Sequence, residues 1–355
     1  MTTRNAKPTW KKGLEVLGGV LIALILTFVV VMVWLVTPGT PSRSSVLDFR
    51  GYIELPGPRA LNVLDYMTLK GKQLFVTGES TGKVYRIDLA AGGTVTGSPV
   101  RVMDGSPSAH GVALLPAGNL AFVSRSDANT VDAFDPLSLS TTKRIPVAED
   151  ADGILYDPES ELIYVVHGDA SLATLIDPSK LETVGTIKLG GKPEFQVLDP
   201  AAHLLYQNLS DTNQLAVVDL KQRAVIAQWP LAGCSGPSGL AIDDTQRRLF
   251  VLCSSNAKLA IFNLSSHQMI AMLPIGGGPD AVAYDCTLHQ IYTAGKDGLL
   301  DVVRQRDPDH YILVDGIHTH YGAHTLALDP QTHNVYVGYA SLFTSPRVAV
   351  FTPKP

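Results

Sequence analysis

The stretch that decides the fold lies between residues 238 and 253 and reads SGLAIDDTQRRLFVLC. Two apolar runs, rich in Leu, Ile, Val and Phe, flank a short polar segment centred on Asp244–Gln246. Short apolar runs on either side of turn-forming residues are typical of a β-hairpin. The stretch begins with a polar residue, four mostly apolar residues and an aspartate, and this beginning recurs along the chain.

The recurring phrase sets the predicted architecture. It starts at positions 65, 110, 152, 194, 238, 280 and 324, so the intervals are 45, 42, 42, 44, 42 and 44 residues. Each copy continues with further short apolar runs, and turn-forming Asp, Pro, Gly and Asn separate them. Four short strands repeated at this period are the signature of a propeller blade. The sequence therefore predicts an all-β, seven-bladed β-propeller with four-stranded blades.

The two ends of the repeat region predict how the ring closes. The last copy stops after its third apolar run, at Val348–Phe351, whereas Phe49–Leu55 precedes the first copy and resembles a fourth strand. Propellers close because an open sheet edge exposes unpaired backbone groups. We expect the N-terminal strand to complete the last blade.

Several phrases carry a family resemblance. IYVVHGD at 163–169, LPIGGGPDAVAYD at 273–285 and GAHTLALDPQTHNVYV at 322–337 resemble the YVTN β-propeller repeats of YncE-like bacterial proteins. The resemblance extends over about residues 50–352. It implies a propeller that is exported from the cytoplasm. Surface association and binding of ligands or nucleic acid are the roles that it raises.

An uncharged apolar run precedes the propeller. No charged residue occurs between Val16 and Val36, and a helix of that length spans about 30 Å, the thickness of a bilayer core. Arg4, Lys7, Lys11 and Lys12 lie ahead of it, which favours a cytoplasmic N-terminus. The alternative is a cleavable signal peptide, whose apolar region is normally shorter, about 7–15 residues.

These features predict four segments: a cytoplasmic tail at 1–13, a transmembrane signal-anchor helix at 14–36, a linker at 37–47 and the propeller at 48–355. The predicted location is the cytoplasmic (inner) membrane, crossed once, with the propeller in the periplasm or outside the cell.

The first residue of each phrase is the candidate ligand site. The first strand of a blade lies innermost, so the starts of the phrases should meet around the axis of the propeller at the channel mouth. The predicted ring consists of Asp65, His110, Asp152, Glu194, Ser238, Asp280 and His324. Crowded carboxylates raise one another's pKa and attract cations or hydrogen-bond donors. Alternatively, these side chains cap turns and satisfy backbone N–H groups.

A divalent metal ion is the one cofactor that the sequence suggests. His318, His320 and His324 occur in HTHYGAH, and imidazoles near carboxylates are common metal ligands. The predicted ligand set is His110, Glu194, Asp280, His320 and His324. Two functions follow. The first is a non-enzymatic ligand- or protein-binding scaffold that uses the channel mouth. The alternative is a metal-dependent, lactonase-like hydrolase with Asp152 as general base.

The remaining signals concern cysteines, catalytic motifs and charge. Cys234 and Cys253 are predicted to form a disulfide, and Cys286 to be buried and unpaired. The sequence has no GxSxG, HExxH or Walker A motif.

After residue 36 there are 28 − 4 = 24 basic and 33 − 1 = 32 acidic residues, a charge near −8. That charge opposes binding to nucleic acid, so an unknown small molecule or protein is the expected partner besides the membrane.

Overall fold

The computed structural model describes residues 19–31, 40–57, 62–90, 95, 97–105, 108–339 and 345–355. The chain divides into two units at the boundary between Gly39 and Thr40, and each unit is considered by itself.

In the first unit, residues 19–31 form a helix whose side chains are all exposed. No helix in the described part of the chain combines the length and the apolar character that crossing a membrane requires. The other positions of the predicted 14–36 span, the 1–13 tail and linker residues 37–39 lie outside the described residues.

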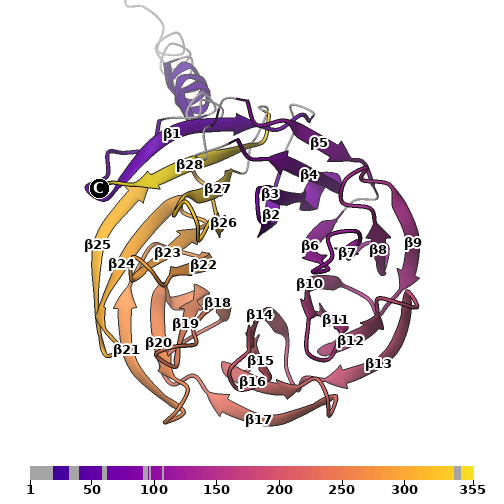
Figure 1. Ribbon diagram of the computed structural model, residues 1–355. Coiled ribbons are helices and arrows are strands. Elements are labelled where there is room, and N and C mark those ends of the chain that lie inside the picture. The colour runs from indigo at the N-terminus through magenta and orange to yellow at the C-terminus, as the bar shows by residue number, and fades with distance from the viewer. Residues whose placement is uncertain are drawn as a thin grey trace, which may run out of the picture. The chain divides into compact units, whose positions relative to one another are not determined.

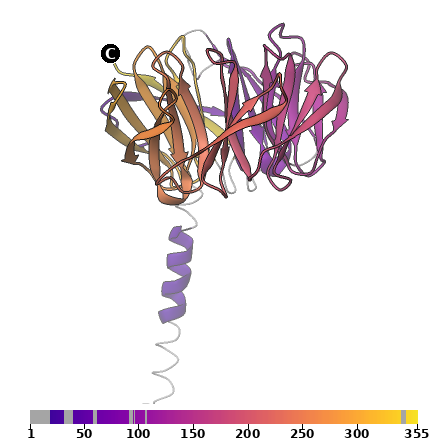
Figure 2. The same ribbon diagram turned by 90° about the horizontal axis from the view of Figure 1, so that it is seen from below.

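The second unit is a ring of seven four-stranded antiparallel sheets, which confirms the predicted all-β, seven-bladed propeller (Figure 1). Seen from the side, the blades stand next to one another, and their strands run between the two faces of the ring (Figure 2). From the innermost strand outward, the first three blades are β2 (Leu64–Lys70), β3 (Gln73–Gly78), β4 (Lys83–Asp88) and β5 (Val100–Met103); β6 (Ala109–Leu114), β7 (Ala121–Arg125), β8 (Thr130–Phe134) and β9 (Thr141–Pro146); and β10 (Ala151–Asp157), β11 (Leu162–His167), β12 (Leu172–Asp177) and β13 (Glu182–Lys188).

The next three blades follow the same order. They are β14 (Pro193–Asp199), β15 (Leu204–Leu209), β16 (Gln214–Asp219) and β17 (Ala224–Pro230); β18 (Pro237–Asp243), β19 (Arg248–Cys253), β20 (Lys258–Asn263) and β21 (Gln268–Pro274); and β22 (Pro279–Asp285), β23 (Gln290–Gly295), β24 (Leu299–Asp307) and β25 (His310–His318).

The seventh blade joins the two ends of the propeller. Its order is β26 (Thr325–Leu328), β27 (Val335–Tyr339), β28 (Arg347–Pro353) and β1 (Leu47–Glu54), so the N-terminal strand is its outermost member, as predicted. β1 pairs with β28 from Leu47 opposite Pro353 to Glu54 opposite Arg347. An aromatic contact reinforces the pairing, because the ring centroids of Phe49 in β1 and Phe351 in β28 lie 5.5 Å apart.

The blades pack through the second strand of each sheet. An aromatic residue occupies the same place in every one, and all seven are at most 1% exposed: Phe75, Phe122, Tyr164, Tyr206, Phe250, Tyr292 and Tyr336. These second strands are buried on both faces, which explains why their sequences are nearly continuous apolar runs.

The three cysteines differ in bonding and in exposure. Cys234 and Cys253 form a disulfide with a Cα–Cα distance of 5.1 Å, joining the loop before β18 to the end of β19. Cys286, which was expected to be buried, is exposed. It follows the last residue of β22 and enters a turn, so its side chain is not part of the strand's packing.

The closure predicts a strong effect of removing β1. A chain lacking residues 1–54 should be less stable than a chain lacking residues 1–39. Leu47 and Ile53 are at most 4% exposed, and burial of two such side chains contributes about 3–6 kcal/mol. Unfolding in guanidinium, followed by circular dichroism, measures the difference. Equal stability of the two chains would show that β1 does not hold the ring closed.

Candidate functional site at the axial mouth

Six of the seven predicted ring residues occupy the second position of an innermost strand, and His324 directly precedes β26. The innermost strands surround the axis in Figure 1. Their starts therefore bring together residues that are about 40–45 positions apart in the chain. The structure thus gathers this repeat position at one mouth of the propeller.

A backbone irregularity brings a second residue of each strand toward the axis. In five innermost strands (β2, β6, β10, β14 and β18) the pairing register shifts between the first and the fourth residue. In a β-bulge, two successive residues oppose one residue of the partner strand, so the usual alternation of side chains is interrupted. The residue after the ring position is thereby able to share the axial side.

The two aromatic residues at this following position form the floor of the mouth. Tyr66 of β2 stacks on Phe195 of β14, with ring centroids 4.7 Å apart, although the strands belong to the first and fourth blades. Gly153 of β10 leaves room for this pair. A Cβ atom there would lie 2.7 Å from the side-chain amide of Gln196 and 3.2 Å from the hydroxyl of Tyr66. The aromatic pair therefore crosses the axis, and a side chain at position 153 would obstruct it.

One side of the mouth is organised around His110. Its Nδ1 lies 2.6 Å from Asp65 Oδ2 and 3.4 Å from Asp152 Oδ1, and its Nε2 lies 2.9 Å from Ser126 Oγ. Burial opposes a charge on the ring, but the hydrogen bond to Asp65 and the charges of Asp65 and Asp152 outweigh it and raise the pKa of His110 to about 9. His110 is thus an imidazolium at neutral pH, and it lies between the side chains of Asp65 and Asp152.

The carboxylates of the mouth are strongly perturbed. Burial, followed by the negative charge of Asp65, raises the pKa of Asp152 to about 8, although His110 acts in the opposite direction. Burial also raises the pKa of Glu194, whose Oε1 accepts a hydrogen bond of 3.0 Å from Ser210. Burial is the largest cause of both shifts, so the mouth disfavours the charged form of these carboxyl groups.

On the other side, Asp280 faces His324 and Lys296 at longer range. Its Oδ2 lies 3.7 Å from His324 Nε2 and 3.8 Å from Lys296 Nζ. Burial raises the pKa of Asp280 despite both neighbours. Ser238 plays another part, because it is buried and its hydroxyl donates to the carbonyl of Pro279 at 2.9 Å. At this ring position the alternative interpretation applies, because the side chain forms a hydrogen bond with the backbone.

The predicted five-residue metal set is not brought together. In the described residues, the group of His, Cys, Asp or Glu whose ligand atoms lie within 4.8 Å of one another is Asp65, His110 and Asp152. HTHYGAH runs from the outermost strand of one blade to the innermost strand of the next, so only His324 reaches the axis. His318 ends β25 and is exposed, and Nδ1 of His320 is 2.9 Å from the carbonyl oxygen of Tyr321.

The donor atoms around His110 interact with one another within the protein. A metal-bound imidazole offers one nitrogen lone pair, but both nitrogens of His110 are engaged, with Asp65 and with Ser126. The raised pKa keeps the second proton on the ring. This group is better described as a hydrogen-bonded cluster of Asp65, His110 and Asp152.

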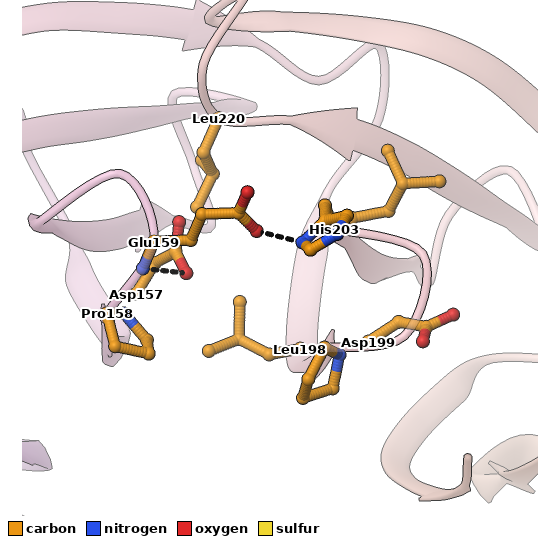
Figure 3. A pocket seen from close by; sticks show the side chains of 9 residues that line it. Asp157, Pro158, Glu159, Leu198, Asp199, His203 and Leu220 are labelled. Atoms are coloured by element: carbon orange, nitrogen blue, oxygen red, sulfur yellow. Dashed lines mark hydrogen bonds and ion pairs between the residues drawn. The ribbon is translucent and has the colours of Figure 1, made fainter. Parts of the chain in front are cut away.

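A separate hollow of about 440 Å³ lies at the opposite ends of the innermost strands, between the blades of β10 and β14 (Figure 3). Leu198 and Pro158 line it, and Glu159 faces His203 across it. His203 is in a left-handed turn position with φ 59°. Arg247 and His333 occupy the same turn position in later blades, and they contact Asp199 and Asp285 of the preceding blade.

In each of these contacts, a turn residue of one blade meets an acidic residue of the preceding blade. The hollow is therefore part of the junction between two blades. Arg247 meets Asp199 with two hydrogen bonds of 2.8 and 2.6 Å. Burial opposes the charge of Asp199, yet Arg247 and other hydrogen bonds lower the pKa of that carboxyl. None of the predicted ring residues lines this hollow.

Comparison with known proteins supports the fold. No protein-family model and no curated protein sequence matches the chain. Among solved structures, the chain is similar to hydrazine synthase of Kuenenia stuttgartiensis, with a TM-score of 0.68 and 18% identity over 83% of this chain and 95% of that one. At that identity the likeness shows the fold alone. Since 1664 chains of solved structures match, the propeller itself does not distinguish between functions.

The raised pKa values predict that stability falls as pH rises. Folded Asp152 binds a proton up to about pH 8, whereas its unfolded pKa is about 3.8, and folded His110 keeps its proton to about pH 9. The folded state thus binds more protons than the unfolded state, and the stability that this provides is lost on raising the pH. Asp152→Asn should lose less stability than the unmodified protein between pH 5 and 8.5.

Thermal unfolding across that pH range measures the effect. Asp244→Asn is the matched control, because Asp244 is exposed in the turn after β18 and the change in charge is the same. The control should follow the unmodified protein. If the Asp152→Asn curve also parallels the unmodified protein, Asp152 does not carry the perturbed proton.

Proposed function

We propose that this protein is a non-enzymatic binding or scaffold module whose ligand or partner enters the axial mouth. The observation that carries the proposal is the convergence of Asp65, His110, Asp152, Glu194 and Asp280 above a stacked aromatic floor. Concave sites with a few convergent polar groups over an apolar surface are typical of ligand binding.

The floor gives the mouth one open side. Because Tyr66 and Phe195 meet across the axis, a ligand that enters from the ring cannot pass between their two rings. The ring residues then surround the place where a ligand would sit. Acidic side chains around the axis favour ligands that carry positive charge or several hydrogen-bond donors.

A binding role agrees with the donor set better than the hydrolase alternative does. The hydrolase requires a metal among His110, Glu194, Asp280, His320 and His324, and these residues are not gathered around one point. Asp152, its intended general base, is instead paired with an imidazolium at 3.4 Å.

We further propose that the propeller is held on the outer face of the cytoplasmic membrane by the 14–36 segment. The uncharged run and the cations ahead of it support this, as does the resemblance to exported YVTN propellers. In the helix at 19–31, exposed apolar side chains such as Leu21, Ile22, Leu24 and Phe28 would be covered by lipid. The Cys234–Cys253 disulfide suits an oxidising compartment.

Ligand binding is tested by thermal-shift screening of metabolites and metal ions against the protein and two mouth variants. Glu194→Gln and Asp280→Asn each remove one carboxyl group of the mouth and nearly preserve shape. Compounds that raise the Tm of the unmodified protein should raise the Tm of the mouth variants much less. Asp244→Asn should respond like the unmodified protein. Ligands that stabilise all four proteins equally would place the binding site outside the mouth.

The anchor is tested by fractionating bacterial cells that express the full chain. The protein should sediment with membranes, resist carbonate extraction and be digested by protease added to spheroplasts. A Leu24→Arg, Val29→Arg variant should be lost from the membrane fraction, since each arginine costs about 2.5–3.5 kcal/mol near the centre of a spanning helix. A full-length protein that remains in the soluble fraction would contradict the proposal.

A further inference from the structure

In the second blade, the ring residue His110 meets a hydroxyl group. Its Nε2 lies 2.9 Å from Oγ of Ser126, the residue that directly follows β7. At the other nitrogen of the ring, Nδ1 lies 2.6 Å from Oδ2 of Asp65. A serine, a histidine and an aspartate that are linked in this order have the connections of a nucleophile, its general base and the group that orients the base.

Asp65 determines which nitrogen of His110 faces the serine without a proton. Its hydrogen bond holds a proton on Nδ1, so the proton that the imidazolium loses first is the one on Nε2. The neutral ring then presents the lone pair of Nε2 to the hydroxyl of Ser126. Asp152 also approaches Nδ1, at 3.4 Å, so both acidic side chains leave Nε2 to the serine.

Ser126 lies at the edge of the mouth, where a small molecule can reach it. It is half-buried and begins a turn in which the N–H group of Asn129 donates to the carbonyl of Ser126 at 3.2 Å. The next three residues of this turn, Asp127, Ala128 and Asn129, are exposed. The side chain of His110 is 13% exposed. A base that is largely shielded from water therefore contacts a hydroxyl group beside solvent.

Another blade provides a matched serine at the same place in the repeat. Ser210 directly follows β15, as Ser126 follows β7. Its hydroxyl donates to Oε1 of the ring residue Glu194 at 3.0 Å. Ser210 thus meets a carboxyl group where Ser126 meets an imidazole, and the two serines differ in the base beside them.

We infer that Ser126 is a nucleophile that takes an acyl group from small activated esters, with His110 as general base and Asp65 as positioning residue. Oγ of Ser126 forms a bond to the carbonyl carbon of the ester, and the hydroxyl proton passes to Nε2 of His110. The bond between that carbon and the leaving oxygen then breaks, and the departing alcohol or phenol takes the proton from Nε2. The products are an acyl-serine and a free alcohol or phenol.

The inference goes beyond the proposed binding function and does not rest on it. The step is a single transfer to the protein itself, so it modifies Ser126 without requiring turnover. An activated ester, such as an aryl ester, is the expected donor because its leaving group departs with little assistance.

Acylation should accelerate as the pH rises. Burial lowers the pKa of His110, but the hydrogen bond to Asp65 and the charges of Asp65, Asp152 and Glu79 raise it to about 9. At neutral pH most of the rings carry both protons and cannot accept one from Ser126. The rate should therefore rise about tenfold per pH unit below that pKa and level off above it.

The test is incubation of the full chain in detergent with 4-nitrophenyl acetate, followed by peptide mass spectrometry. Ser126 should be acetylated about tenfold faster than Ser210 or more, and the rate at Ser126 should level off near pH 9. Both serines are measured in the same sample of unmodified protein, so this comparison does not depend on whether any variant folds.

Variants then assign the roles. His110→Gln should slow acetylation of Ser126 about a hundredfold or more, since it removes the general base. Asp65→Asn should move the midpoint of the pH profile below 9, because it removes the hydrogen bond and the charge that raise the pKa of His110. Ser210→Ala is the matched control and should leave acetylation of Ser126 unchanged. Circular dichroism and the melting temperature confirm that each variant is folded.

Three results would overturn the inference. The first is acetylation of Ser126 and Ser210 at equal rates, and the second is a folded His110→Gln protein that reacts at the unmodified rate. The third is a pH profile that Asp65→Asn does not move, which would remove Asp65 from the arrangement. The proposed binding site is judged separately, by the thermal-shift screen with Glu194→Gln and Asp280→Asn.

Discussion

The pairing of β1 with β28 is the constraint on which the rest of the structure depends. Three of the four strands in the seventh blade come from the end of the chain, and the fourth comes from before the first blade. Without β1, the row of backbone groups on β28 that pairs from Leu47 to Glu54 would lie open. Closure therefore does more than finish one sheet. It fixes the number of blades and thereby the width of the space that their innermost strands enclose.

Closure also explains why the mouth is electrostatically unusual. A repeat that places one polar residue at the start of every innermost strand must crowd those residues around a single axis. Asp65, Asp152, Glu194 and Asp280 would be ordinary turn carboxylates in an open sheet. In the ring they share an enclosed space, so burial and mutual repulsion raise the pKa of Asp152, Glu194 and Asp280. His110 relieves part of that repulsion by staying protonated between two of them.

The sequence predicts well the features that all seven repeats share. It predicts poorly the features in which single repeats differ. Strand order, blade number, closure and the gathering of phrase starts follow from a period of 42–45 residues. The Tyr66–Phe195 pair was missed because side-chain alternation assigns residues after the ring position to the other face, and the bulge changes that assignment. Large residues at 66 and 195, with glycine at 111, 153 and 239, were the available signal.

Ser238 and His320 show a second reason why the sequence alone does not predict the site completely. Position 238 belongs to the repeat, but the backbone of the next strand brings the carbonyl of Pro279 within 2.9 Å, and a short hydroxyl is satisfied there. The position in the repeat does not reveal such a neighbour. His320 was grouped with His324 because they are close in sequence, yet the segment between them crosses from the outside of one blade to the inside of the next. In a propeller, distance along the chain is a poor guide to distance from the axis except at equivalent repeat positions.

The aromatic floor and the charged ring depend on each other. An axial space lined with polar groups and open at both faces would admit water from two sides, and water would screen the carboxylates. By crossing the axis, Tyr66 and Phe195 fill space beside Gly153 with apolar surface. Lower solvation strengthens both the repulsion among the carboxylates and the attraction that they exert on a cation. The proposed binding role of the mouth therefore depends on two uncharged side chains as much as on the acids around them.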